Sequence, residues 1–223
     1  MTLSGAPRPL EILEPGTVAY GAGLELQGAL VTQRRAGEIP DTLILLEHPH
    51  VFTMGSSADP AHILIDQEER DRRGIELFDA GRGGDVTYHG PGQLVVYPIL
   101  DLKPDRKDLH RYLRDLETVL QRVAASFGIE AERSDSGTGI WTPNGKLAAI
   151  GVRVSSGWIT SHGVALNVTS DLAFFDAIVP CGIPDGGVTS MVRELGQAPD
   201  SWEVRAAFVR HFAEVFERDV TGG

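Results

Sequence analysis

One periodic run of apolar residues constrains the fold of this chain more than any other feature. Its members recur at alternating spacings of four and three residues: Leu109, Leu113, Leu116, Leu120, Val123 and Phe127. That period places them on a single stripe of an α-helix that packs one face on a protein core. We therefore predict a helix over residues 106–127, with Asp105 as its N-cap and Gly128 where it stops.

Shorter apolar runs rich in branched residues predict β-strands. The expected strands cover residues 10–13, 17–20, 42–46, 75–78, 93–100, 146–154 and 158–168. Residues 66–74 are expected to form a charged turn, and residues 155–157 (Ser-Ser-Gly) the turn of a hairpin. Two further helices are expected, over residues 24–35 and 200–216. Strands flanked by helices, with a hairpin among them, favour an α/β or α+β fold with a mixed sheet.

Length and composition fit one soluble domain. The 223 residues carry 42% hydrophobic side chains, contain neither a repeat nor a linker, and predict a single domain over residues 1–223 with residues 1–8 as a loose tail. No apolar run approaches the roughly 20 residues of a membrane span. The N-terminus lacks the pattern of a secretory signal. A single cysteine indicates a reducing compartment, so we expect a cytoplasmic protein.

The net charge of −11 argues against nucleic acid and anionic membranes as partners, because both select basic surfaces. Two local clusters of basic residues remain. Arg70, Arg72 and Arg73 lie close together, and Lys107, Arg111, Arg114 and Arg122 recur on the expected long helix. Each cluster is read either as a solvated face or as a local basic patch.

A glycine-rich segment over residues 81–93 has the composition of a ligand-binding loop. Its five glycines allow the backbone to approach a ligand closely, and successive N–H groups in such a loop bind anionic oxygens. Arg82, Thr87, Tyr88 and His89 add directional hydrogen-bonding groups. The segment matches neither GxxxxGK[ST] nor a GxGxxG that opens a helix, so it is not a nucleotide-binding loop of those kinds. The alternative is a glycine-rich turn between strands.

The lone cysteine, Cys181, lies between Pro180 and Gly182 and is expected on a loop. Loop cysteines are more exposed and reactive than cysteines in strands, although many free cysteines are buried and structural. A nucleophilic cysteine needs a neighbour that favours the thiolate. The candidates in the sequence are His48, His89, His162 and Lys146.

Lys146 stands out because only three of the twenty Lys and Arg residues are lysines. It opens an apolar strand, where a lysine, unlike an arginine, is able to lose its proton and act as a base. The histidines allow a second interpretation. His48, His50, His89, His162 and Cys181 are residue types that bind zinc, but no CxxC or HExxH motif accompanies them.

The segment Arg82-Gly-Gly-Asp-Val-Thr-Tyr-His-Gly-Pro-Gly-Gln93 resembles the signature of the lipoyl(octanoyl) transferases, which transfer octanoyl groups in lipoate biosynthesis. Four other segments occur in that family's order: Leu46-Glu-His-Pro49, Gly145-Lys-Leu-Ala-Ala-Ile-Gly151, Ser161-His-Gly-Val-Ala-Leu-Asn-Val168 and Pro180-Cys-Gly182. The similarity covers roughly residues 10–215. It implies the fold of the biotin and lipoate protein ligase catalytic domains, a mixed sheet flanked by helices.

The resemblance also implies the site. Cys181 is the expected nucleophile and Lys146 its partner, with no cofactor and no metal. The residues expected to bind the acyl group are Arg82, Gly83, Gly84, Asp85, Val86, Thr87, Tyr88, His89, Ala149, Ile150, Gly151, His162, Gly163 and Val164, with His48 in support. Asp85 stands where the family's residue varies and is given no catalytic role.

The implied reaction moves an octanoyl group from acyl carrier protein to Cys181 and then to a lysine of a lipoyl domain. The implied acceptors are the lipoyl domains of 2-oxoacid dehydrogenases and the glycine cleavage H protein, and the enzyme is expected to be a monomer. Its two alternatives are an ATP-dependent lipoate–protein ligase of the same fold and a non-catalytic module that binds acylated carriers. Because the carriers are acidic, docking is expected at residues 70–73 or at Lys107, Arg111 and Arg114.

Overall fold

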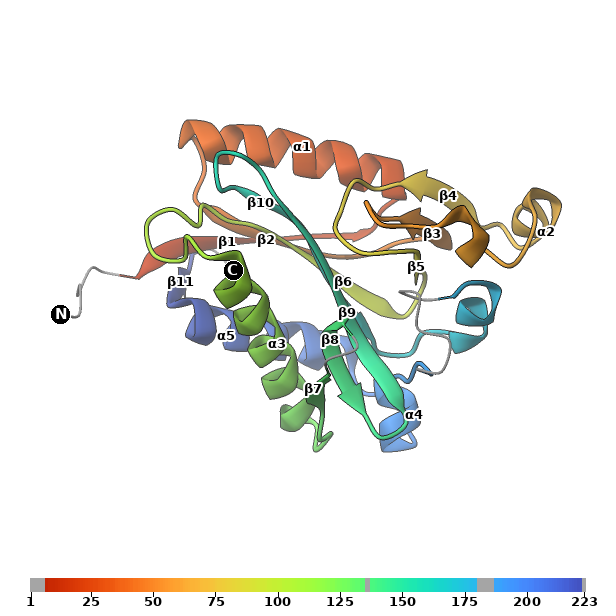
Figure 1. Ribbon diagram of the computed structural model, residues 1–223. Coiled ribbons are helices and arrows are strands. Elements are labelled where there is room, and N and C mark those ends of the chain that lie inside the picture. The colour runs from red at the N-terminus through yellow and green to blue at the C-terminus, as the bar shows by residue number, and fades with distance from the viewer. Residues whose placement is uncertain (1–6, 135–136, 180–186, 222–223) are drawn as a thin grey trace.

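The computed structural model describes residues 7–134, 137–179 and 187–221, and shows a large mixed sheet with helices on both faces and a smaller sheet at one end (Figure 1). Its strands are β1 (Arg8–Thr17), β2 (Asp41–Glu47), β3 (Val51–Met54), β4 (Glu76–Asp79), β5 (Thr87–His89), β6 (Gln93–Ile99), β7 (Glu132–Ser134), β8 (Gly137–Thr142), β9 (Gly145–Val154), β10 (Thr160–Asn167) and β11 (Arg218–Val220). Its helices are α1 (Tyr20–Ala36), α2 (Gln67–Arg72), α3 (Leu109–Ser126), α4 (Met191–Leu195) and α5 (Ser201–Phe216). The mixed α/β fold class is confirmed.

The large sheet has the order β11-β1-β2-β6-β10-β9-β8-β7, and the small one the order β4-β3-β5. In the large sheet β1 pairs in parallel with β2 and β11, whereas β6, β8, β9 and β10 pair antiparallel with their neighbours. The predicted hairpin is β9–β10, in which Gly151 pairs with Gly163 and Ile150 with Val164. This hairpin crosses the centre of the molecule and forms one wall of the site described below.

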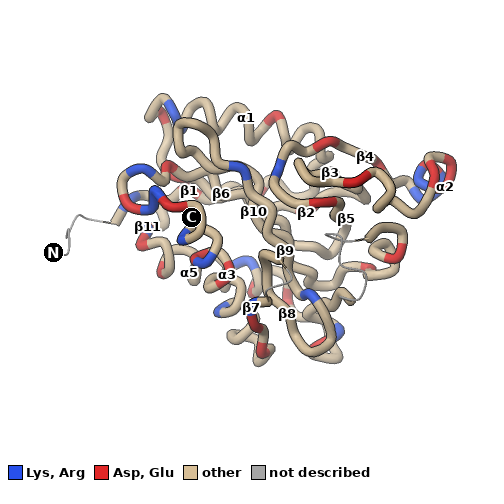
Figure 2. The backbone as a smooth tube through the Cα atoms, in the orientation of Figure 1, with Lys and Arg blue, Asp and Glu red and all other residues tan. Residues whose placement is uncertain are grey.

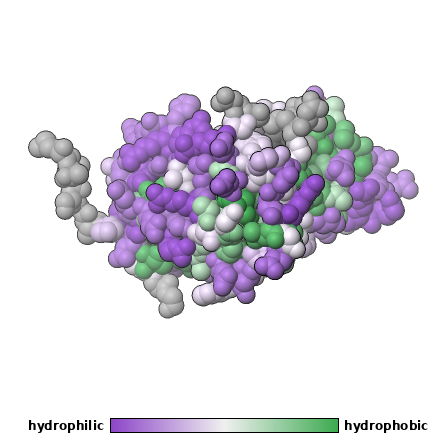
Figure 3. Space-filling model, turned by 90° about the horizontal axis from the view of Figure 1, so that it is seen from below, coloured by the Kyte–Doolittle hydropathy of each residue, from purple (hydrophilic) through white to green (hydrophobic). Residues whose placement is uncertain are grey.

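The surface carries charges of both signs, interspersed over helices and loops (Figure 2). Viewed from below, it is mostly hydrophilic, and its apolar areas are separate from one another (Figure 3). Large hydrophobic side chains are exposed at Leu64, Leu77, Leu109, Trp202 and Val220. Among the described helices, none combines the length and the apolar composition that a membrane crossing requires.

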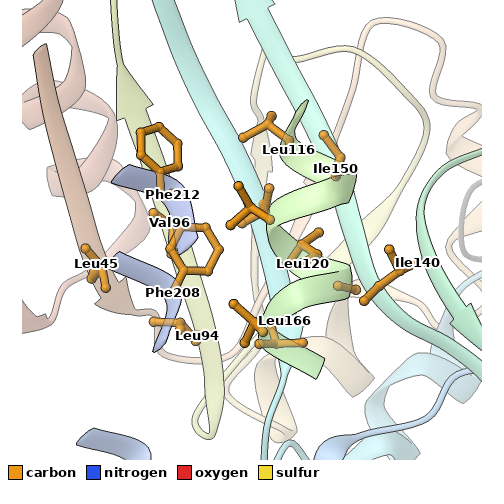
Figure 4. Close-up of a cluster of buried hydrophobic side chains, with 14 of the residues drawn as sticks. Leu45, Leu94, Val96, Leu116, Leu120, Ile140, Ile150, Leu166, Phe208 and Phe212 are labelled. Atoms are coloured by element: carbon orange, nitrogen blue, oxygen red, sulfur yellow. The ribbon is translucent and has the colours of Figure 1, made fainter. Parts of the chain in front are cut away.

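The main hydrophobic core lies between the sheet and the helices α3 and α5 (Figure 4). Leu116, Leu120 and Val123 of the predicted stripe are fully buried in it. They meet Phe208 and Phe212 of α5 and sheet residues such as Val96 and Leu166. Burial of each large apolar side chain contributes roughly 1.5–3 kcal/mol, so this face of the sheet supplies a large share of the folding free energy.

The start of α3 differs from the prediction. Asp108, not Asp105, is the N-cap, and its carboxylate accepts a hydrogen bond from the amide of Arg111 at 3.1 Å. Asp105 instead binds Arg218 at 2.7 Å and Arg8 at 3.0 Å, an ion-pair network that sequence spacing does not reveal. The helix ends at Ser126, and Gly128 has the left-handed φ of +76° that favours glycine.

Of the other predicted strands, helices and turns, some are confirmed and some are wrong. The strands predicted at residues 42–46 and 93–100, the β9–β10 hairpin and the last helix are confirmed, and Asp200 caps α5. The expected strand at residues 17–20 is wrong, because β1 continues to Thr17 and α1 already begins at Tyr20. The turn at residues 66–74 contains α2, which Asp66 caps. The glycine-rich segment is not only a loop, since its residues 87–89 form β5.

Candidate functional site

A cavity of about 280 Å³ lies between the β9–β10 hairpin and the glycine-rich segment. Most of the residues predicted to bind the acyl group line it: Arg82, Gly83, Gly84, Asp85, Thr87, His89, Ala149, Ile150, Gly151, His162, Gly163 and Val164. Lys146, the predicted partner of Cys181, lines it as well. The hairpin contributes an apolar floor and two polar residues, Lys146 and His162, and the glycine-rich segment opposite carries further polar groups. An apolar pocket with a few convergent polar groups is the usual form of a small-molecule site.

Three predicted residues lie away from this lining. Val86 and Tyr88 are buried in a separate hydrophobic cluster with Phe52 and Phe175, because alternate residues of a strand face opposite sides. His48 is also buried, and it lies outside the lining of the cavity. Its Nδ1 donates to the carbonyl of Val18 at 2.6 Å, so its Nε2 accepts from the hydroxyl of Tyr97 at 2.7 Å.

Six lining residues were absent from the prediction: Tyr20, Ser57, Tyr97, Gly137, Thr138 and Ala165. Ala165 directly follows the predicted binding residues His162–Val164 on the same predicted strand, so the sequence already pointed to it. Tyr20 and Tyr97 belong to α1 and β6, and only the tertiary packing brings them to the cavity. Burial raises the pKa of Tyr20 to about 12, against the opposing effect of the Arg82 charge, so this phenol is neutral.

Arg82 links the small sheet to the glycine-rich segment through hydrogen bonds. Its Nη2 donates to the carbonyl of Thr53 at 2.7 Å and to the hydroxyl of Thr53 at 2.8 Å, and its Nη1 donates to the carbonyl of Gly83 at 3.0 Å. Gly151 allows this approach, because a Cβ there would lie 3.1 Å from Cδ of Arg82 and 3.2 Å from the Gly83 carbonyl. The buried guanidinium also places a positive charge beside the cavity.

His89 is held in one tautomer by a chain of amides. The carbonyl of Thr189 only accepts, so Nδ2 of Asn167 faces it at 3.0 Å and Oδ1 of Asn167 accepts from Nε2 of Gln93 at 2.9 Å. Oε1 of Gln93 therefore faces His89 at 2.7 Å, and Nδ1 of His89 carries the hydrogen. Burial, aided by His48, lowers the pKa of His89 to about 3. A neutral imidazole whose Nε2 is an acceptor thus lines the cavity.

His162 occupies an irregular position in β10. Its φ is +55°, which non-glycine residues seldom adopt. Its amide donates to Oε1 of Gln27 on α1 at 2.7 Å, so that N–H is not available to an oxyanion. Burial, with the charges of Arg82 and Arg153, lowers the pKa of His162 to about 4, against a backbone hydrogen bond of Ala80.

Lys146 lies near the start of β9 with only 9% of its surface exposed. Its ammonium is 4.7 Å from the ring centroid of Trp141, a cation–π distance. Its amide donates to the carbonyl of Gly187 at 2.8 Å, and its carbonyl accepts from the amide of Thr189 at 3.0 Å. Gly145 permits this pairing, since a Cβ there would be 2.4 Å from the Gly187 carbonyl. The lysine side chain is therefore firmly placed in the cavity wall.

Cys181 lies outside the described residues, which end at Val179 and resume at Gly187 on this side of the cavity. Both flanks are close to the site. The amide of Val179 donates to the carbonyl of His62 at 2.8 Å, and the ring of His62 binds the carboxylate of Asp85 at 2.6 Å. Asp85 lines the cavity. Gly187 is the backbone partner of Lys146.

The zinc interpretation has no support from the described residues. Among them, no group of three or more His, Cys, Asp or Glu side chains is placed to hold a metal ion. His50 stacks on Phe174 at 4.1 Å between ring centroids, and its Nδ1 shares a hydrogen bond of 2.8 Å with the hydroxyl of Tyr88.

Comparison with known proteins gives a consistent result. The Lipoyl protein ligase A/B catalytic domain family matches residues 19–213. An octanoyltransferase of Rubrobacter xylanophilus is 54% identical over 202 residues, which are 90% of each chain. An octanoyltransferase of Chloroflexus aurantiacus is 47% identical and covers 94% of this chain and 95% of that one. A crystal structure of lipoate-protein ligase A bound with ATP has a TM-score of 0.71 at 19% identity, with 98% and 90% of the chains covered, so the fold is shared.

Proposed function

We propose a mechanism from the premise that this chain belongs to the Lipoyl protein ligase A/B catalytic domain family. The chain is an acyltransferase that transfers octanoyl groups in protein lipoylation. In the proposed mechanism Cys181 carries the octanoyl group as a thioester and Lys146 moves the protons. The observation that supports it most is the backbone pairing between Lys146 and Gly187, which ties the lysine to the chain segment that follows Cys181.

The other flank gives a second argument for proximity. Cys181 is two residues from Val179, and two residues span at most about 7 Å. Val179 is hydrogen-bonded to His62, whose ring binds Asp85 in the cavity wall. A cysteine tethered this closely at one end, with Lys146 held at the other flank, is consistent with a thiol at the cavity mouth.

The first half-reaction is a thioester exchange. The Cys181 thiolate attacks the octanoyl carbonyl, the S–C bond to the carrier's thiol breaks, and a new S–C bond to Cys181 forms. The ammonium of Lys146 favours the thiolate and donates a proton to the departing thiolate. The acyl chain lies on the apolar floor formed by Ala149, Ile150, Val164 and Ala165. One thioester replaces another, so the step needs no ATP.

The second half-reaction forms the amide. The ε-amine of a lipoyl-domain lysine attacks the acyl carbon, the bond to Cys181 breaks, and the now neutral Lys146 takes up the proton that the amine loses. His89 contributes a hydrogen-bond acceptor here, because its unprotonated Nε2 faces the cavity while Nδ1 is bound to Gln93. We propose that this acceptor orients the amine before attack.

Intact-mass spectrometry tests the thioester. Wild-type enzyme mixed with octanoyl-carrier protein is expected to gain one octanoyl group before an acceptor is added, and Cys181→Ala is expected to gain none. Lys146→Met serves as the partner variant and should form the adduct far more slowly. Cys181→Ser that retains full transfer activity, or a wild type without an adduct in a single turnover, would contradict the mechanism. ATP-dependent transfer of free lipoate would favour the ligase alternative.

The donor is proposed to be octanoyl-acyl carrier protein. The proposed acceptors are the lipoyl domains of 2-oxoacid dehydrogenases and the glycine cleavage H protein, and the enzyme is proposed to act as a monomer in the cytoplasm.

The two predicted docking patches also contain acidic residues that pair with their basic ones. Arg72 and Arg73 pair with Glu69, while Arg111 pairs with Asp115 and Arg114 with Glu117. In Figure 2 both colours accordingly lie together on α2. Reversal of Arg73 or Lys107 to Glu should raise KM for the carrier with little change in kcat. Unchanged values for both variants would remove these patches as docking sites.

A further inference from the structure

A second cavity, of about 400 Å³, adjoins the same pair of strands on the side of α1. Its lining includes Gln27, Gly28, Arg153, Ser161 and His162. Among the described residues, His162 is the one that lines both cavities. The two spaces are therefore separated at the position of a single side chain.

The strand register locates this boundary. Gly151 and its partner Gly163 face the first cavity, Arg153 and its partner Ser161 face the second, and the pair Val152–His162 lies between them. The ladder of β9 and β10 thus continues past His162 into the second cavity. A ligand that follows the first cavity along β9 meets the His162 position next.

Residues of both cavities hold His162 in its conformation. Its backbone is in the left-handed region, which is strained for a residue with a side chain. Gln27, a wall residue of the second cavity, holds the amide, and Tyr97 of the first cavity meets the ring edge-on at 6.2 Å between centroids. His162 as a whole is 5% exposed, as expected for a residue between two cavities.

We propose that the His162 side chain closes the far end of the acyl cavity and sets the upper limit on acyl chain length. The proposal rests on an acyl carbon located beside Lys146. Cε of Lys146 lies 3.0 Å from the position of a Cβ at Gly139, and Gly139 pairs with Ala149, so the end of the lysine side chain is at the level of Ala149. From Ala149 to Val152 is three residues of β9, roughly 10 Å. An extended octanoyl chain measures roughly 9 Å from carbonyl carbon to methyl, and a dodecanoyl chain roughly 14 Å, at ordinary C–C lengths and angles. With the thioester and the ammonium at one end, eight carbons end short of His162, whereas twelve reach it.

His162→Gly tests this limit, because glycine adopts a φ of +55° without strain and removes the ring. Transfer to a lipoyl domain is measured with octanoyl- and dodecanoyl-carrier protein. The ratio of kcat/KM for dodecanoyl over octanoyl should rise at least about tenfold, the scale on which pockets discriminate between chains. His162→Asn, which also tolerates the left-handed region, should raise the ratio less and serves if the glycine variant does not fold.

Filling the second cavity supplies the matched control. Gly28 lies on α1 with no atom within 4 Å of an added Cβ, and its side of the helix lines that cavity. The Gly28→Leu variant alone should keep the wild-type ratio of kcat/KM for dodecanoyl over octanoyl. Combined with His162→Gly, it should remove most of the increase in that ratio, because the leucine fills the space that the longer chain would enter. A ratio that stays at the wild-type value in both His162 variants would overturn the proposal. Because transfer itself is measured, this outcome is independent of whether an acyl-Cys181 adduct is detected.

Discussion

The two faces of the large sheet are built from the same strands and have opposite characters. Leu45 of β2 and Val96 of β6 point to α3 and α5, into a core that is hydrophobic throughout. The next residue of β6, Tyr97, points to the other face, where buried polar groups surround the cavity. The alternation of a strand thus separates the residues that hold the fold together from those that carry the chemistry.

The face of the sheet that carries the cavity buries polar and charged side chains in addition to apolar ones. Neutral His89 and His162 and the charged Arg82 are all buried there, and each is hydrogen-bonded to a neighbour from another element. Buried polar groups cost free energy unless they are paired in this way. Substitutions should therefore lower stability on one face and activity on the other, and the following experiments test that division.

The largest effect is expected in the core. Phe208 is fully buried between α5 and the sheet, so Phe208→Ala should lower the free energy of unfolding by about 3–5 kcal/mol. Chemical denaturation measures this change, and kcat of the folded variant should stay near the wild-type value. Trp202→Ala on the same helix is the control, because a side chain that is 73% exposed should contribute within about 0.5 kcal/mol. A large loss of kcat in Phe208→Ala would contradict the division.

Lys146→Met should reverse this pattern. Removal of the proton carrier is expected to reduce kcat by about 10²–10⁴-fold, while the melting curve shifts little because the aliphatic stem is kept. Lys107→Met is a matched control, since Lys107 also lies over a tryptophan, 5.6 Å from the Trp158 ring, away from the cavity. Equal losses of activity in the two variants would point to the cation–π contact rather than to proton transfer.

A smaller effect is expected from Gln93, which acts on the cavity through His89. Gln93→Leu removes the acceptor for Nδ1, frees the second tautomer and should lower kcat roughly tenfold. Gln93→Glu keeps an acceptor and adds a negative charge that raises the pKa of His89. Its activity should therefore be closer to wild type at pH 8 and fall earlier on acidification. Identical pH profiles for both variants and wild type would exclude a role for the tautomer.

The last prediction is a pH dependence of stability, which is small near pH 7 and grows on acidification. The pKa of His89 is lowered to about 3 in the folded state, below the ordinary 6.5, so the unfolded state binds the extra proton first. Its contribution to stability is complete above pH 6.5 and is lost as the pH falls towards 3, by up to about 1.4 kcal/mol per pH unit. Denaturation at pH 7, 5.5 and 4.5 should show a steeper loss for wild type than for His89→Gln. Equal slopes would mean that His89 protonates without opposing the fold.

Much of the fold was predictable from local patterns. The alternating stripe of α3, the β9–β10 hairpin and the C-terminal helix α5 depend on the period of neighbouring residues and on turn chemistry, which a sequence displays directly. Boundaries were less accurate. At α3 the prediction named Asp105 as the cap, whereas Asp108 takes that position and Asp105 binds Arg218, which lies 113 residues away.

The sequence by itself determined the fold class, the family and most of the cavity wall, because glycines, histidines and an apolar hairpin occur there in a specific order. The tertiary structure alone decided which of those side chains face the cavity. Tyr88 faces away from the cavity because side chains alternate along β5, and Val86, just before this strand, faces away as well. Tyr97 faces the cavity because side chains also alternate along β6. His162 separates two cavities because α1 packs beside β10. Such contacts join residues distant in the chain, so no local pattern encodes them.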